Sequence, residues 1–129
     1  MPTILFLCVA NSARSQMAEG LARSLAPAGW RFLSAGSNPG VLNPLAVQVM
    51  AEIGIDISGQ RAKGLEGVPL DEVETIVTLC AEEVCPVIPG TVQRRHWPLR
   101  DPRDLAEFRA IRDELGQRLP TLWDQPNER

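Results

Sequence analysis

The hydrophobic positions of this chain follow two alternating patterns, continuous apolar runs and helical spacings. Continuous runs, such as the one at residues 4–9, are typical of parallel strands covered on both faces. Four segments are predicted as strands: 4–8, 30–35, 75–79 and 92–97. Three segments are predicted as amphipathic helices: 15–25, 44–53 and 105–119. Strands that alternate with helices predict an α/β fold, a doubly wound, four-stranded parallel sheet with helices on both faces.

Local signals mark where two of these helices begin. Asn43 is the predicted N-cap of a helix with Pro44 at its first position, and Leu45, Val49 and Ile53 would form its inner face. Asp104 is the predicted N-cap of the last helix, because Glu107 follows three residues later, as in a capping box. Residues 57–70 are predicted as loop with a helical turn, and 81–85 as a short helix.

The composition is that of one globular domain, which we place at residues 1–129. Apolar residues make up 44% and charged residues 22%, which argues against disorder, and no apolar run is long enough to cross a bilayer. A net charge of −3 disfavours binding to nucleic acid or to a membrane surface. We expect a cytoplasmic protein, because no basic segment precedes the first apolar run. We also expect it to be a monomer.

Three cysteines and one histidine give little support for a structural or metal-binding role of the thiols. An odd number of cysteines in a reducing compartment disfavours structural disulfides. Without a C-x2-C pair, a zinc site is also disfavoured, so we expect no metal at these residues.

The turn between the first strand and the first helix predicts an oxyanion-binding loop. Cys8 ends the strand, Arg14 follows six positions later, and a helix opens behind them. Backbone N–H groups and the positive end of the helix dipole would converge on an anion, and the guanidinium of Arg14 would add two donors. The same field stabilises a thiolate at Cys8, which makes it a nucleophile. The loop consists of Val9, Ala10, Asn11, Ser12, Ala13, Arg14 and Ser15.

The alternative interpretation of this turn is a buried strand cysteine, with no chemical role, followed by an ordinary strand–helix connection. The C-x5-R spacing alone is short, and its position between a buried strand and a helix start favours the anion loop. Within the loop, we expect the side chains of Asn11 and Ser15 to fix its shape and to hydrogen-bond the Cys8 thiolate.

Cys80 and Cys85 form a second group, which follows the third predicted strand. A disulfide between them requires Cα atoms within about 7 Å and therefore some bending of a helical segment. The alternatives are a redox pair that relays a disulfide, or one core cysteine and one incidental surface cysteine. Because Cys8 and Cys80 both follow strands of one parallel sheet, they are predicted at the same edge, which favours redox chemistry.

Asp101 precedes Pro102 in the loop after the fourth strand, again at the carboxyl edge of the sheet. There its carboxyl group could protonate a leaving oxygen above the anion loop. A turn aspartate is the alternative, although Asp104 is the better helix cap and leaves Asp101 available. His96 lies inside a predicted strand and is interpreted as structural.

Taken together, these motifs resemble the thioredoxin-coupled arsenate reductases, which share the low-molecular-weight tyrosine phosphatase fold. The likeness rests on the run from Cys8 to Ser15, the Cys80/Cys85 pair and Asp101–Pro102. Other stretches that look like family sequence are Ser34–Gly36, Asn43–Ala46, Glu52–Gly59 and Phe108–Leu115.

The resemblance implies a mechanism and partners. Cys8 would attack arsenate held by the loop and Arg14, while Asp101 protonates the departing hydroxyl. Cys80 would then attack Cys8 and release arsenite, and Cys85 would attack Cys80. Thioredoxin would supply the electrons by reducing the Cys80–Cys85 disulfide, with phosphate and sulfate as analogues of the substrate. The implied role is arsenical resistance through detoxification.

The chain departs from the family pattern in two respects. The interval between Cys80 and Cys85 is shorter than in many relatives. Asn11, Glu19 and Ser34 match a potassium site of some relatives, but its acidic partner near Lys63–Leu65 is not evident, so potassium stays open and no tightly bound cofactor is expected.

The first alternative function is a tyrosine phosphatase that uses Cys8, Arg14 and Asp101. The chain has no tyrosine, and Arg103 and Asp104 follow the Asp–Pro pair where such phosphatases carry aromatic residues, which disfavours this alternative, although a weak side activity is compatible with the site. The second alternative is a non-catalytic oxyanion sensor, which the complete set of nucleophile, arginine, acid and two further thiols disfavours.

Overall fold

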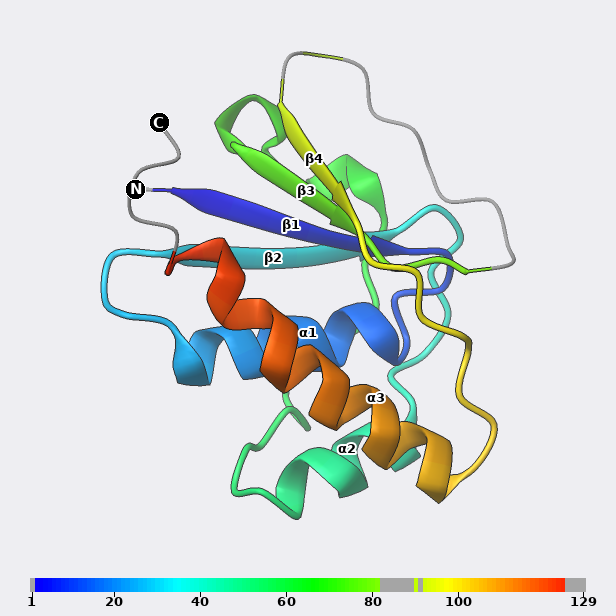
Figure 1. Ribbon diagram of the computed structural model, residues 1–129. Coiled ribbons are helices and arrows are strands. Elements are labelled where there is room, and N and C mark those ends of the chain that lie inside the picture. The colour runs from blue at the N-terminus through cyan, green and yellow to red at the C-terminus, as the bar shows by residue number, and fades with distance from the viewer. Residues whose placement is uncertain (1, 82–89, 91, 125–129) are drawn as a thin grey trace.

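The computed structural model describes residues 2–81, 90 and 92–124. Four strands form one sheet in the order β2–β1–β3–β4, and every neighbouring pair is parallel (Figure 1). The strands are β1 (Thr3–Cys8), β2 (Arg31–Gly36), β3 (Thr75–Thr78) and β4 (Gln93–His96). The predicted four-stranded parallel sheet is therefore confirmed.

The positions of β1 and β4 in the sheet follow their polarity. All six residues of β1 are buried, because β1 pairs with β2 on one side and β3 on the other. The polar strand β4 lies at an edge, and three of its four residues are exposed. The continuous apolar run, predicted as a parallel strand covered on both faces, is thus confirmed as a buried interior strand.

The three α-helices pack together on one face of the sheet (Figure 1). They are α1 (Arg14–Leu25), α2 (Pro44–Ala51) and α3 (Leu105–Arg118). The opposite face buries a smaller apolar cluster that includes Leu5 and Leu7. Among the described residues, this second face is covered by a segment with two short 3-10 helices, η1 (Leu65–Gly67) and η2 (Leu70–Glu72). The helical turn predicted within 57–70 is one of these.

Both predicted helix caps are present, whereas the predicted inner face of α2 was partly wrong. The side chain of Asn43 accepts a hydrogen bond from the Leu45 N–H at 2.8 Å, and that of Asp104 accepts one from the Glu107 N–H at 2.9 Å. Ile53 is 47% exposed, because α2 ends at Ala51 and the chain turns before Ile53 can reach the core. Ala46, Val49 and Met50 are the residues that α2 buries.

The sheet brings the two cysteine-bearing strand ends to one edge. Cys8 is the last residue of β1, and Cys80 follows the adjacent strand β3 by two residues. The pairing continues past β3, since the Leu79 N–H donates to the Leu7 carbonyl at 2.9 Å. Most of the helix predicted at 81–85 lies outside the described residues. Among the helices that the structure describes, none is long and apolar enough to cross a membrane.

Candidate active site

The loop between β1 and α1 is held in shape by hydrogen bonds that its carbonyl groups accept from a neighbouring segment. Three of them accept backbone N–H bonds at 2.8 to 2.9 Å, those of Val9, Ala10 and Ser12, from Asn38, Gly40 and Asn43 respectively. In a trans peptide the N–H points away from the C=O, so each of these bonds turns the next residue's N–H toward the inside of the loop. The Asn11 N–H accordingly lies 3.3 Å from the Cys8 sulfur.

A cavity of about 170 Å³ lies inside this loop. Its lining residues are Cys8, Val9, Ala10, Ser12, Ala13, Arg14 and Asp101. Helix α1 begins at this cavity, and its N-cap, Ala13, makes no side-chain capping bond. Inward N–H groups and the positive end of α1 make the cavity favourable for a small anion. The structure thus gathers Cys8, Arg14 and Asp101, which the sequence proposed as one site, around one space.

The thiol of Cys8 is free, 2% exposed, and surrounded by hydrogen-bond donors. Its sulfur lies 3.0 Å from the Ser15 hydroxyl oxygen, which can donate to a thiolate. Asn11 contacts the sulfur through its backbone N–H, and its side-chain amide donates instead to the Ser15 hydroxyl at 2.7 Å. The prediction for Ser15 is therefore confirmed, whereas the Asn11 side chain acts through Ser15.

Asn11 has a left-handed backbone, with φ of 51°, a conformation that asparagine tolerates better than most residues. Its side chain and carbonyl are fixed by the amide of Gln16 at 2.9 and 3.0 Å, and by the backbone N–H of Lys63 at 2.8 Å. Sequence reasoning missed Gln16 and Lys63. Gln16 lies five positions from Asn11, but a glutamine in the first turn of a helix is no signal by itself. Lys63 lies 52 positions away and meets Asn11 only once residues 60–63 pack against the loop.

Arg14 is 4% exposed and fixed in place before any ligand arrives. One guanidinium nitrogen donates to the Leu99 carbonyl at 2.8 Å, and another lies 3.9 Å from a carboxylate oxygen of Asp101. The Asp101 side chain is 75% exposed, at the mouth of the cavity. Because Asp104 caps α3, Asp101 is not needed for that role, as predicted.

Of the two remaining cysteines, the structure describes Cys80 and not Cys85. Cys80 is 2% exposed at the same edge of the sheet as Cys8, and Cys85 lies outside the described residues. His96 is a strand residue whose ring nitrogen lies 2.6 Å from the Thr78 hydroxyl. Within the part of the chain that the structure describes, no group of three His, Cys, Asp or Glu side chains could hold a metal ion.

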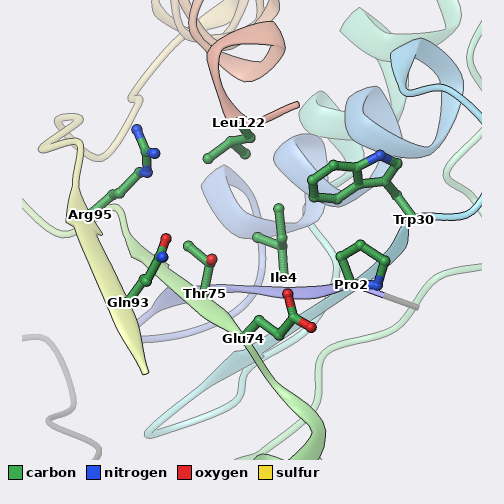
Figure 2. A pocket seen from close by; sticks show the side chains of 8 residues that line it. All are labelled: Pro2, Ile4, Trp30, Glu74, Thr75, Gln93, Arg95 and Leu122. Atoms are coloured by element: carbon green, nitrogen blue, oxygen red, sulfur yellow. The ribbon is translucent and has the colours of Figure 1, made fainter. Parts of the chain in front are cut away.

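A second cavity, of about 250 Å³, opens at the opposite end of the sheet (Figure 2). Figure 2 shows Ile4, Trp30 and Leu122 on its apolar side, with Glu74 and Arg95 among its polar residues. Its lining contains no cysteine among the described residues, and it lies at the amino ends of the parallel strands, where ligands of such sheets do not normally bind. The cavity at the β1–α1 loop is therefore the candidate active site.

Fold and cavity together define a class of protein: a parallel α/β protein with a cysteine and an arginine in an oxyanion-sized loop. Residues 3–129 match the family model "Low molecular weight phosphotyrosine protein phosphatase". The chain therefore belongs to this family.

Similar proteins within the family include arsenate reductases. Arsenate reductase 2 of Staphylococcus saprophyticus is 41% identical over 126 residues, which span 95% of this chain and 96% of that protein. A solved arsenate reductase in a phosphate-binding state has a TM-score of 0.85 at 34% identity and covers 95% of this chain and 96% of its own. A thioredoxin-dependent arsenate reductase of Corynebacterium glutamicum has a TM-score of 0.78 at 31% identity, and covers 96% of this chain and 61% of its own. The resemblance noticed from the motifs is confirmed.

Proposed function

We propose that this protein reduces arsenate to arsenite through a three-cysteine relay that thioredoxin regenerates, and that it serves arsenic detoxification. The observation that carries the proposal is the cavity in which Cys8, Arg14 and Asp101 surround space for one small oxyanion. The similarity to arsenate reductases, one of them thioredoxin-dependent, supports the choice of substrate and reductant.

The first step is attack on arsenate. The Cys8 thiolate, hydrogen-bonded by Ser15, forms a bond to arsenic, while one oxygen leaves as water after taking a proton from Asp101. The guanidinium of Arg14 and the inward N–H groups stabilise the negative charge on the other oxygens. The product of this step is a thiol–arsenate adduct in which arsenic is still pentavalent.

The second step transfers two electrons to arsenic. The Cys80 thiolate attacks the Cys8 sulfur, the sulfur–arsenic bond breaks, and its electron pair stays on arsenic, which leaves as arsenite. A Cys8–Cys80 disulfide remains. Cys85 then attacks Cys80, which restores the Cys8 thiolate and leaves a Cys80–Cys85 disulfide. The dithiol of thioredoxin reduces this disulfide and becomes oxidised itself. Adjacent strand ends at Cys8 and Cys80 support the transfer between them.

A tyrosine phosphatase would need the same nucleophile, arginine and acid, so the surroundings of Asp101 decide between the two. The side chain of Arg103 is paired with Glu107 at 2.8 Å, and Asp104 caps α3. In the described part of the chain, the residues that line the cavity include no aromatic ring to stack against a phosphotyrosine. These features support arsenate over an aryl phosphate as the substrate.

The test is arsenate-dependent NADPH oxidation with thioredoxin and thioredoxin reductase, for the wild type, Cys80→Ser and Cys85→Ser. We expect turnover by the wild type only. A single-turnover control separates the two variants: Cys85→Ser should release one arsenite per protein molecule, and Cys80→Ser none.

Two results would contradict the proposal in different ways. Turnover with glutathione and glutaredoxin, but not with thioredoxin, would replace the proposed reductant. If no variant reduces arsenate and all three hydrolyse para-nitrophenyl phosphate equally, the protein is a phosphatase.

A further inference from the structure

Glu19 of α1 is a carboxylate that folding has taken out of water. It is 3% exposed and accepts a hydrogen bond from the Ser34 hydroxyl of β2 at 2.5 Å. Arg23, one turn further along α1, forms an ion pair with it. A buried carboxylate needs cations and donors around it, because its lost hydration is otherwise uncompensated.

A second cation approaches Glu19 from a distant part of the chain. Lys63 is the only lysine of this protein, and all the other lysine or arginine positions are arginines. Its ammonium nitrogen lies 3.0 Å from the Arg61 carbonyl oxygen, 3.4 Å from the Ser34 hydroxyl oxygen and 3.8 Å from a Glu19 carboxylate oxygen. A carbonyl, a hydroxyl and a carboxylate are the oxygen ligands that a bound metal cation would also use.

The backbone of Lys63 connects this cation to the active site. Its N–H donates to the Asn11 side-chain oxygen at 2.8 Å, and its carbonyl accepts from the Gly36 N–H at 2.9 Å. Asn11 in turn donates to Ser15, whose hydroxyl contacts the Cys8 sulfur. Only Asn11 and Ser15 therefore separate Lys63 from the nucleophile.

This arrangement does not fit the potassium site that the family resemblance suggests. The matching residues are Asn11, Glu19 and Ser34, and Lys63 contacts all three: Asn11 through its N–H, Glu19 and Ser34 through its ammonium. A potassium ion there would compete with the ammonium for the same oxygens and would be repelled by its charge. Where an acidic partner was expected, the chain carries a cation.

We propose that the Lys63 ammonium is a built-in cation that takes the place of potassium at Glu19 and Ser34. From there Lys63 acts as a positioning residue: it holds the 60–63 segment against β2 and α1, so that its N–H keeps Asn11, and through it Ser15, in place. The reaction of this protein is then independent of potassium. The catalytic part of this inference rests on the proposed arsenate reduction, and the structural part does not.

The first measurement uses the wild type in potassium chloride and in tetramethylammonium chloride at equal ionic strength. We expect the same kcat/KM for arsenate and the same thermal unfolding midpoint in both salts, because no oxygen cage is left for potassium. If the wild type has a higher unfolding midpoint or a higher kcat/KM in potassium chloride than in tetramethylammonium chloride, the proposal is overturned, whatever the variants show.

The second measurement uses Lys63→Met, which removes the ammonium and keeps an apolar stem. In tetramethylammonium chloride we expect the kcat/KM of this variant to fall about 10-fold. Losses of this size are typical when a residue that orients the functional side chains, without touching the substrate itself, is replaced. Potassium chloride should restore most of this loss and raise the unfolding midpoint, because potassium can then bind Glu19 and Ser34. A loss that potassium does not reverse would mean that Lys63 is merely structural, against the proposal.

Two controls complete the design. Lys63→Met combined with Glu19→Gln lacks the anion and should show no response to potassium, while Arg31→Gln removes an exposed cation paired with Glu72 and should behave as the wild type does. If no form of the protein reduces arsenate, the proposed function fails, and the unfolding midpoints still decide the role of Lys63. If Lys63→Met does not fold, the comparison of the two salts in the wild type decides it.

Discussion

The guanidinium of Arg14 donates a hydrogen bond to the carbonyl oxygen of Leu99 at 2.8 Å, across 85 positions of sequence. This bond ties the start of α1 to the segment that leads into Asp101, so the anion-binding arginine and the candidate acid are positioned by one contact. It also leaves another nitrogen of Arg14 facing the cavity side, 3.9 Å from Asp101. The Arg14 guanidinium therefore fixes the segment at Leu99 with one nitrogen and presents another to the cavity.

Replacing Arg14 by lysine tests this double role. Lysine keeps the charge but cannot bond Leu99 and the oxyanion together, so we expect kcat/KM for arsenate to fall by about 10²–10³. Steady-state kinetics measures the loss, with Arg31→Lys as the matched control on an exposed arginine. A change of less than threefold would show that charge alone is sufficient at this position.

Replacing Asp101 by asparagine removes the candidate proton donor. We expect kcat to fall about 10²-fold or more, since protonation of the leaving oxygen is lost. Inhibition by phosphate should stay as strong as in the wild type, because the loop and Arg14 hold the anion. Asp104→Asn is the control, as asparagine is also a good N-cap. Equal activity of the two variants would contradict the role of Asp101.

Replacing Gly36 by alanine tests how closely β2 approaches the oxyanion loop. A Cβ at this position would clash with the Val9 carbonyl oxygen and lie 2.9 Å from the Asn11 nitrogen, both of them backbone atoms. We expect destabilisation by about 1–3 kcal/mol and loss of activity, because the loop must move. Urea unfolding measures the first effect. Gly59→Ala, where a Cβ would meet nothing within 4 Å, should be close to neutral.

Replacing Glu52 by glutamine tests an ion-pair network that joins the end of α2 to α3. Hydrogen bonds from Arg109 and then Arg112 lower the pKa of Glu52 from 4.5 to about 2. A lowered folded-state pKa contributes stability above pH 4.5 that is lost as the pH falls toward 2. We expect the wild type to unfold at a higher temperature than Glu52→Gln at pH 7, and the gap to shrink by pH 3. A gap that is the same at both pH values would exclude this linkage.

The sequence by itself determined the architecture, because the hydrophobic effect acts on patterns that are local in the chain. The unbroken apolar run before Cys8 made β1 a strand buried on both faces, and Asn43 and Asp104 capped their helices through contacts two or three residues away. The oxyanion loop was equally local, since Cys8, Arg14 and the start of α1 lie within one short segment.

Only the tertiary structure decided the contacts that join distant segments. The bond from Arg14 to Leu99 and the approach of Lys63 to Glu19 depend on how loops pack once the sheet has formed. Such contacts use backbone carbonyls and single polar side chains, which leave no periodic signal in a sequence. Ile53 was misplaced for the same reason, because where α2 ends is set by its packing and not by its apolar spacing. The chain thus encodes the oxyanion loop locally and the contacts that support it at long range.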